Sequence, residues 1–365
     1  PALPVPADHD IMVFTDETAA DQAGAGWRAN PIGDLARQAR RFDLIVYQMG
    51  NSPAHDFMAD ALFQYPGLVV LHDLSLHYFF ARQQDSRYLR AFGYGYGSLG
   101  TELGRRFRRG FIPIEYPDYL LSEWLIDRSP GVIVHSRHAL NLLSARCPTA
   151  RLVHAPMPIP LPPDRSISAA RAALGVEPAG FLVGIFGVLN DSKQPRAVLA
   201  ALRQLLDDGL SIKAVFIGRE NDTFHLADEA PRYGVRDHII APGFVGDAAQ
   251  LSNWLAACDV AVNLRSPYWG ETSASALRVL AAGTPVIVNA VGSFAELPDA
   301  VGLKLPPAGP VLTDELASAL RQVYMQPDRR AAMRAAARQH VAIEHDPRRA
   351  AARYLEAATL ILEAA

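Results

Sequence analysis

Short runs rich in valine and isoleucine alternate with helical patterns along almost the whole chain, and this alternation is what most restricts its fold. The clearest runs lie at 43–49, 67–72, 131–136, 151–155, 181–187, 212–218, 259–264 and 284–290. Continuous apolar runs of this length are typical of strands that helices cover on both faces. Strands and helices that alternate in this way form parallel sheets with right-handed crossovers.

The alternation is interrupted once, by the proline-rich segment 154–166. Proline lacks a backbone N–H and fixes φ, so such a segment continues neither a sheet nor a helix and reads as a stiff linker. At 365 residues the chain is also longer than most single cores. We expect two Rossmann-like, doubly wound α/β domains, at 1–155 and 156–340, whose facing edges form a cleft. A C-terminal helix, 341–365, is expected to pack back toward the first domain.

Composition excludes several classes of protein. Half of the residues are hydrophobic and a fifth are charged, which predicts a packed globular chain. A net charge of −3 argues against a uniformly basic, nucleic-acid-binding surface. The two cysteines, Cys147 and Cys258, have no disulfide or metal-ligand spacing. No apolar run is long enough to span a bilayer, and no signal peptide is evident. We expect a cytoplasmic protein that can associate with the cytoplasmic face of a membrane.

The segment that begins PYWGETS combines an acid, several hydroxyl groups and the start of a helix. Thr272 or Ser273 can cap this helix, and Gly283 can end it. The free N–H groups and positive dipole end of such a helix favour a phosphate. Gly270 would let a ligand approach the backbone, with Glu271 beside it. A strand–helix unit that merely has a polar first turn fits these residues equally well.

The continuation of this segment, ALRVLAAGTPVIVNAVGSFAELP, resembles the donor-site segment of the family 4 glycosyltransferases, which have the two-domain GT-B fold. Two glutamates precede the Gly-Thr-Pro-Val turn in that family, and in register they fall here on Gly270 and Arg278. A subgroup with a GETS loop is more similar, and there Glu271 is the acid. The resemblance implies that Glu271 contacts the donor sugar. Arg278 either replaces a missing cation at the diphosphate or marks a site that has drifted from catalysis.

A second segment, FGVLNDSKQPRAVLAAL, resembles the family's loop in which an arginine and a lysine hold the donor diphosphate. Lys193 matches the lysine, and Val188 stands where the family has the arginine. Arg278 and Arg265 are the candidates for the second cation. A solvated surface lysine is the alternative reading of Lys193. The nucleobase of the donor would rest on Phe244 and Val245, which follow the residues APG. The full donor-binding set that the resemblance implies is Gly187, Asn190, Lys193, Phe244, Val245, Gly270, Glu271, Thr272, Ser273, Ala274 and Arg278.

Polar residues that follow two strands of the first domain also resemble this subgroup. His72 is the candidate for contacting the transferred sugar or the acceptor, and Asp73 would orient it. A histidine bonded to the backbone at a strand end is the alternative. With Glu271, these two residues form the predicted catalytic set. The predicted acceptor-binding residues are Asn51, Ser52 and His55.

The segment LGRRFRRGF carries four arginines beside two phenylalanines. Such a face can contact anionic lipid or a charged acceptor, although a solvated helix face is the alternative. The four residues are Arg105, Arg106, Arg108 and Arg109.

The resemblance implies a retaining glycosyltransferase that moves a sugar from a nucleotide-diphosphate donor to a hydroxyl acceptor without a metal ion or other cofactor. A non-catalytic nucleotide-sugar or glycan-binding subunit, and a sugar-nucleotide epimerase or hydrolase, remain open. One element departs from the family. The segment DIMVFTD near the start reads as the second strand of the first domain, which implies that the usual first strand and its loop are absent.

Overall fold

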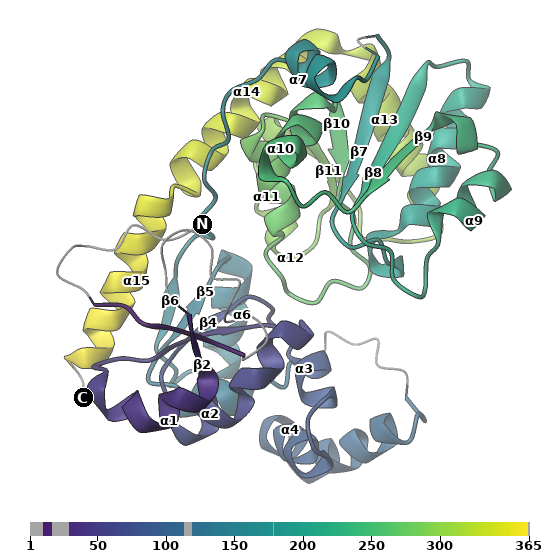
Figure 1. Ribbon diagram of the computed structural model, residues 1–365. Coiled ribbons are helices and arrows are strands. Elements are labelled where there is room, and N and C mark those ends of the chain that lie inside the picture. Colours follow the sequence, from purple (N-terminus) through teal and green to yellow (C-terminus); the bar gives the residue numbers. More distant parts are fainter. Residues whose placement is uncertain (1–9, 17–28, 113–118, 178, 364–365) are drawn as a thin grey trace. The chain divides into compact units, whose positions relative to one another are not determined.

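The computed structural model describes residues 10–16, 29–112, 119–177 and 179–363, which form two compact units (Figure 1). The N-terminal unit takes the described parts of Ala2–Met157, Trp269–Thr272 and Pro347–Ala365. The C-terminal unit takes those of Pro158–Tyr268 and Ser273–Asp346. The chain therefore returns to the N-terminal unit twice after leaving it.

The N-terminal unit is built on a four-stranded parallel sheet in the order β3-β4-β5-β6. Its strands are β3 (Val46–Met49), β4 (Leu68–Leu71), β5 (Val132–Val134) and β6 (Leu152–His154). The helices are α1 (Leu35–Gln38), α2 (Ala59–Gln64), α3 (His77–Ala81), α4 (Asp85–Arg108), α5 (Glu123–Arg128), α6 (Arg137–Arg146) and α15 (Pro347–Leu362). Short 3-10 turns accompany them: η2 (Ile32–Asp34), η3 (Ala39–Arg41) and η4 (Pro53–Met58).

The two faces of this sheet are covered by different parts of the chain. Alternate side chains of β4 point to opposite faces, so Val69 and Leu71 pack against helices α2 to α6. Leu68 and Val70 pack on the other face, where α15 supplies Ala357 and Ile361. Because both faces are covered, the central strands β4 and β5 are apolar and buried throughout, as expected from their valine and isoleucine runs.

The segment DIMVFTD contains β1 (Val13–Thr15). It pairs in parallel with β2 (Ala29–Pro31) in a separate two-stranded sheet. That it is the second strand of the first domain, with the usual first strand absent, stays a prediction. Ile11, Met12 and Val13 are each more than a third exposed, so this run lacks the two-sided cover that the main strands have.

The C-terminal unit contains a six-stranded parallel sheet in the order β12-β11-β10-β7-β8-β9. Its strands are β7 (Phe181–Phe186), β8 (Ile212–Ile217), β9 (Ile239–Gly243), β10 (Val260–Val262), β11 (Val286–Asn289) and β12 (Gly302–Leu305). From the central β7 the chain adds strands outward in one direction and then, from β10, in the other. Doubly wound sheets bind ligands at the carboxyl ends of the strands that flank such a reversal, here β7 and β10.

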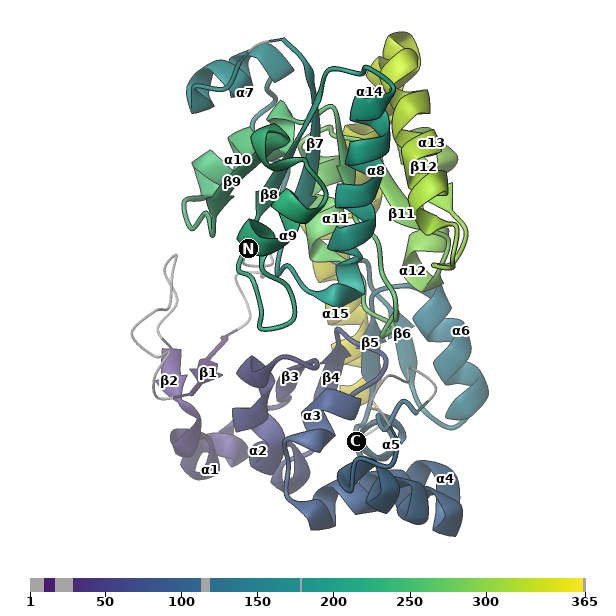
Figure 2. The same cartoon turned by 90° about the vertical axis from the view of Figure 1, so that its right-hand side faces the viewer.

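Helices cover both faces of this sheet. Figure 2 shows α8 and α13 on one side of the strands and α7 and α10 on the other. The helices are α7 (Ile167–Leu174), α8 (Pro195–Asp207), α9 (Leu226–Arg232), α10 (Ala248–Ala257), α11 (Ala274–Ala281), α12 (Gly292–Ala295), α13 (Leu312–Met325) and α14 (Pro327–Glu344). The 3-10 turns are η5 (Asp191–Lys193), η6 (Arg236–His238) and η7 (Asp299–Val301).

The chain passes from one unit to the other at segments that contain proline. The first change falls between Met157 and Pro158, inside the proline-rich linker. A later one falls between Asp346 and Pro347, which separates α14 from α15. The segment 341–365 is therefore the end of α14 followed by α15, rather than one helix from 341. Pro347 explains the break, because a proline disfavours the helical conformation of the residue before it.

Candidate functional site

Lys193 lies at the carboxyl end of β7 in the C-terminal unit. Its Nζ donates a hydrogen bond of 2.7 Å to the carbonyl oxygen of Phe186, the last residue of that strand. Gly187 follows with φ of +91°, and a Cβ there would lie 2.5 Å from the Lys193 Nζ. Only glycine leaves room for the ammonium group and adopts this φ without strain. The local backbone thus places a cation at the point where the sheet reverses.

The turn that carries Lys193 precedes α8. Asn190 accepts a hydrogen bond of 2.7 Å from the Ser192 hydroxyl within this turn, so its side chain shapes the loop. Gln194 has φ of +54°, and Pro195 then opens α8, a position that suits proline. Lys193 therefore lies just before the helix, at the end of η5.

The second part of this site is the N-terminus of α11. Ser273, and not Thr272, is the cap residue, because the Ser273 hydroxyl accepts the Ala276 N–H at 3.3 Å. That hydroxyl also lies 3.0 Å from the Ser275 hydroxyl, which accepts a bond of 2.9 Å from the Asn263 amide. Ala274 is the first residue of the helix. Hydroxyl and amide groups are thus gathered at the carboxyl end of β10, beside the free N–H groups of the first turn.

Arg265 brings a second cation to this place. Its Nη2 donates to the Ser273 hydroxyl at 3.4 Å and its Nη1 to the Leu264 carbonyl oxygen at 2.7 Å. The guanidinium lies over the Phe294 ring, 5.6 Å from its centroid, and the residue is only 9% exposed. The next residue, Ser266, connects this loop to the Lys193 turn, because its N–H donates a hydrogen bond to the Ser192 carbonyl oxygen. Lys193 and Arg265 therefore come from two adjoining loops.

Arg278 has a different environment from Arg265. It is exposed and lies in the last turn of α11, one helical turn beyond Ala274.

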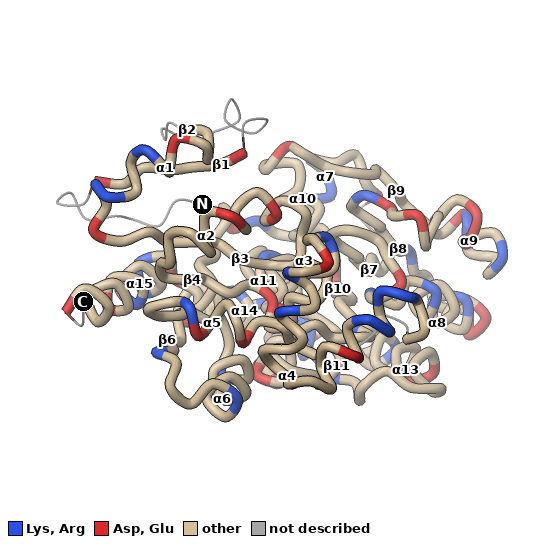
Figure 3. Tube along the Cα trace, turned by 90° about the horizontal axis from the view of Figure 1, so that it is seen from below, with Lys and Arg blue, Asp and Glu red and all other residues tan. Residues whose placement is uncertain are grey.

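A further arginine, Arg196, follows the Lys193 turn, but it pairs with Asp191 and Glu229. Figure 3 shows how acidic and basic residues intermix around α8 and α9 in this way. Arg265 is thus the cation that accompanies Lys193.

The predicted base-binding pair follows β9. Phe244 is 62% exposed, and the guanidinium of Arg219 lies 4.6 Å from its ring centroid. Val245 is buried. Since β9 is two strands from β7, this pair lies about 10 Å along the same sheet edge from the Lys193 turn.

Three histidines lie side by side in the N-terminal unit. The ring of His72 has its centroid 6.2 Å from that of His55 and 5.1 Å from that of His135. The His72 Nε2 is 2.8 Å from the Gln48 Oε1. Burial, reinforced by the two neighbouring rings, lowers the pKa of His72 to about 3. Burial also lowers the pKa of His55 and brings that of His135 to about 4, so all three rings are neutral at pH 7.

Asp73 and Asn51 form the next part of this cluster. The Asp73 Oδ2 accepts the Asn51 backbone N–H at 2.6 Å. Burial, with a smaller contribution from the nearby charge of Glu271, raises the pKa of Asp73 to about 6 despite the Asn51 N–H, which lowers it. The Asn51 side chain accepts the Phe79 N–H at 3.1 Å and donates to the Ser75 carbonyl oxygen. These bonds give Asn51 a role in holding the loop after β4, in addition to the acceptor binding that its position predicts.

Ser52 caps η4, because its hydroxyl accepts the Ala54 N–H at 3.3 Å. This bond makes Ser52 part of the local turn structure. The role of Ser52 and His55 in acceptor binding stays a prediction.

The loop Trp269–Thr272 belongs to the N-terminal unit, whereas Ser273 belongs to the C-terminal unit. The Ser75 N–H donates to the Trp269 carbonyl oxygen at 3.1 Å, and Glu271 Oε2 accepts the Trp269 N–H at 3.0 Å. A Cβ on Gly270, which has φ of +82°, would lie 2.1 Å from that of Leu74. The glycine therefore makes room for the chain's own Leu74. Glu271 accordingly lies near Asp73, and the predicted donor set is divided between the units.

The remaining sequence features have structural roles. Arg108 donates to the carbonyl oxygens of Ala81 and Gln83 and lies over the Tyr88 ring. Arg105 and Arg106 pair with Glu102. Arg109 follows α4 and is exposed, and the predicted membrane contact of this face stays a prediction. Both cysteines, Cys147 and Cys258, are reduced and buried.

The described residues contain no group of three or more His, Cys, Asp or Glu side chains placed to hold a metal ion. In the same ranges, every helix is too short or too polar to cross a bilayer.

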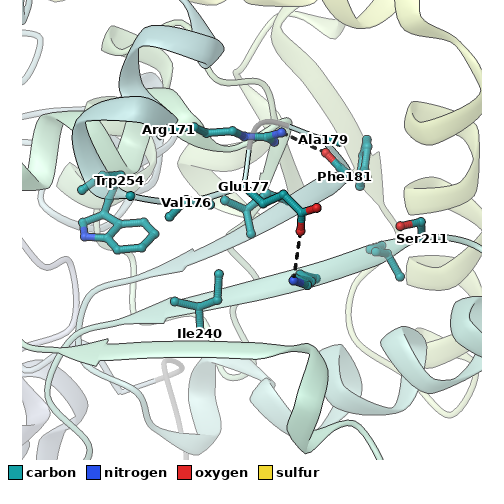
Figure 4. A pocket seen from close by; sticks show the side chains of 14 residues that line it. Arg171, Val176, Glu177, Ala179, Phe181, Ser211, Ile240 and Trp254 are labelled. Atoms are coloured by element: carbon teal, nitrogen blue, oxygen red, sulfur yellow. Dashed lines mark hydrogen bonds and ion pairs between the residues drawn. The ribbon is translucent and has the colours of Figure 1, made fainter.

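A pocket of about 530 Å³ lies at the opposite edge of the C-terminal sheet, by the amino ends of β7 and β8 (Figure 4). Its charged side chains already have protein partners. Glu177 pairs with Lys213 at 3.7 Å, and Arg171 is held by Asp259 and by the Gly180 carbonyl oxygen. The candidate functional site is therefore the β7–β10 edge rather than this pocket.

The sequence-based prediction missed some members of both clusters. Asn263 and Ser275 complete the hydroxyl and amide group at the α11 N-terminus, and His135 completes the row of histidines. Each follows an apolar run or a helix start by one or two residues, and that position is the signal that could have found them.

Residues 167–340, which lie in the C-terminal unit, match the model of a protein family described as glycosyl transferases group 1. The lipopolysaccharide core biosynthesis mannosyltransferase LpsB of Rhizobium meliloti (strain 1021) is 29% identical over 182 residues. This alignment covers 48% of the chain and 50% of LpsB, so the chain matches about half the length of this relative.

Two solved structures extend the likeness to nearly the whole chain. Sucrose-phosphate synthase from Thermosynechococcus elongatus has a TM-score of 0.68 and 18% identity, and the match covers 93% of this chain and 82% of that one. HepE from Anabaena, solved with UDP and glucose, has a TM-score of 0.62 and 18% identity, over 93% and 87%. At these identities the likeness establishes the fold alone. The predicted α/β fold of the GT-B type is confirmed.

Proposed function

We propose that this chain is a retaining glycosyltransferase that moves a hexose from a nucleoside-diphosphate sugar to a hydroxyl acceptor. One observation carries the proposal: two cations, Lys193 and Arg265, lie with the N-terminus of α11 at the carboxyl ends of β7 and β10. Doubly wound sheets bind phosphates at such a point. The family match of the C-terminal unit supports the same reading.

The chemistry that this arrangement favours is the departure of a diphosphate. When the bond between the sugar and the diphosphate breaks, negative charge develops on the leaving phosphate. The Lys193 ammonium, the Arg265 guanidinium and the first N–H groups of α11 would stabilise that charge. Since two side-chain cations can supply this stabilisation, we propose that the reaction needs no metal ion or other cofactor.

The relatives support the hexose part of the proposal. LpsB is named as a mannosyltransferase, and the HepE structure contains UDP and glucose. We propose that the nucleobase of the donor rests beside Phe244, whose exposed ring offers a flat apolar surface.

The polar cluster of the N-terminal unit would bind sugar hydroxyl groups. A neutral imidazole can both donate and accept hydrogen bonds, which suits His72 for this role rather than for proton removal. We propose that the departing phosphate itself takes the proton of the acceptor hydroxyl, on the same face of the sugar, which leads to retention. Asp73 and Glu271 would accept hydrogen bonds from sugar hydroxyls.

A non-catalytic nucleotide-sugar-binding subunit is the second candidate. Val188 favours it, because this half-exposed residue stands where the resemblance places an arginine. Arg265 weakens that argument, since it restores a second cation.

A panel of nucleoside diphosphates tests the donor site. We expect UDP or GDP to raise the melting temperature of the full chain, with a stabilisation of about 2.7 kcal/mol at 100 times the dissociation constant. The measurement is thermal unfolding with UDP, GDP, ADP and dTDP, each against its nucleoside as control. If none of the diphosphates shifts the transition more than its nucleoside does, the proposed donor site is wrong.

Arg265 and Arg278 form a matched pair of arginines for testing the second cation. We expect Arg265→Met to weaken binding of the stabilising diphosphate about 10- to 150-fold, because a charge-assisted hydrogen bond contributes about 1.5–3 kcal/mol. Arg278→Met should change it less than twofold. Calorimetric titration with the diphosphate and with the nucleoside checks this. An equal loss for both ligands would show that Arg265 only supports the fold, and the reverse ranking would assign the cation to Arg278.

A further inference from the structure

His135 follows β5 and holds a buried nitrogen that the mechanism above does not use. The residue is 5% exposed, and its Nδ1 lies 2.9 Å from the Ala155 carbonyl oxygen. Because a carbonyl oxygen only accepts, Nδ1 must carry the proton. The ring is neutral, so Nε2 carries a lone pair. No group of the described chain hydrogen-bonds to this Nε2.

A buried acceptor without a partner is unfavourable by about 1–3 kcal/mol. Phenylalanine would fill much of the same space without that cost, so the ring nitrogen calls for an explanation. Its surroundings give one, because the His135 ring lies 5.1 Å from that of His72 and is tilted by 31°. The His72 side chain is partly exposed, and its ring hydrogen-bonds to the exposed side chain of Gln48. A ligand that reaches Nε2 of His135 would have to displace part of this cover, and we infer that a rotation of the His72 ring does so.

We propose that Nε2 of His135 is a binding atom of the polar cluster around His72, and that it accepts a hydrogen bond from a hydroxyl group of an uncharged saccharide. This assignment rests on the proposed function only for the class of ligand. The lone pair of a neutral imidazole attracts an O–H group and repels a carboxylate or phosphate oxygen. His135 would thus select for an unmodified hydroxyl at this position of the sugar.

The test uses the full chain and two uncharged probes, methyl α-mannoside and methyl α-glucoside, titrated by ligand-observed NMR. His135→Asn keeps an N–H for the Ala155 carbonyl oxygen but, being shorter, has no acceptor at the position of Nε2. We expect it to weaken binding of at least one glycoside about two- to tenfold, the range of one neutral hydrogen bond. His135→Gln, whose longer side chain carries an amide oxygen further out, should recover part of this loss. His138→Asn, on α6 of the same unit, is the control and should bind as the unmodified chain does.

Two results would overturn the proposal. In the first, the unmodified chain binds neither glycoside, or binds a hexuronate more tightly than either of them. In the second, His135→Asn and His135→Gln melt at lower temperature yet bind the glycosides unchanged, which is the outcome for a purely structural residue. The glycoside titration contains no nucleotide, so its result does not depend on whether the proposed diphosphate site exists. Conversely, a negative glycoside titration would not affect the measurement of diphosphate binding.

Discussion

Replacing Lys193 by alanine is expected to abolish sugar transfer, with turnover falling at least about 100-fold while the protein stays folded. The ammonium group is held against the Phe186 carbonyl oxygen by a turn whose glycine leaves it just enough room. It is thus pre-positioned where the leaving diphosphate would gain charge. An interaction made with developing charge lowers turnover when it is lost, and not only affinity.

The measurement is turnover with the nucleotide sugar whose diphosphate stabilises the chain, together with the melting temperature. Lys213→Ala is the matched control. Lys213 is an exposed lysine of β8 that pairs with Glu177 at the opposite edge of the sheet, and its loss should leave turnover unchanged. Unchanged turnover in Lys193→Ala would remove the diphosphate role of this lysine. A melting temperature well below that of the control would instead assign the residue to the fold.

The second large effect is expected at Asp259, which joins several elements of the C-terminal unit. Its carboxylate accepts from the Arg171 guanidinium at 2.7 Å and from the Leu182 N–H at 2.8 Å, and Arg330 of α14 lies 3.4 Å away. Asp259 and Arg171 are at most 5% exposed. Removing one partner of a buried ion pair leaves the other charge uncompensated, so Asp259→Ala should destabilise the unit by about 3–5 kcal/mol.

Calorimetric unfolding checks this expectation, at about 2–4 °C of melting temperature for each kcal/mol in a unit of this size. Asp164→Ala is the control, since Asp164 is 81% exposed at its side chain and lies 3.9 Å from Arg338. Exposed pairs of this kind contribute at most about 1 kcal/mol. Equal melting temperatures for the two variants would mean that the buried network adds nothing to stability.

Strands that helices cover on both faces could be predicted from the sequence, because such cover demands continuous apolar runs. β4, β5, β7 and β8 all lie within the predicted runs. β9 has no such run, since it is an edge strand whose last residues are exposed and include a proline. β1 pairs only with β2 among the described strands, and a short apolar run does not reveal which sheet it joins.

The candidate site was predictable where a residue directly follows a strand, as His72 does, or lies in the loop between a strand and the next helix, as Lys193 does. The choice between Arg265 and Arg278 was not, because it depends on which arginine lies beside the Ser273 cap after folding. The division of the GETS segment between the two units could not be predicted from the sequence either. Nothing in its local sequence shows that Trp269 would bond with Ser75, almost two hundred positions earlier.

The position of α15 on the N-terminal sheet bears on how the protein is made. Leu68, Val70 and Ile133 form an apolar face that only α15 covers among the described helices. Synthesis proceeds from the N-terminus, so this face is complete long before residues 347–362 leave the ribosome. During that interval this apolar face of the nascent chain is exposed to solvent. The N-terminal unit therefore matures last although it is translated first, and a chaperone that shields this face would act on it before release.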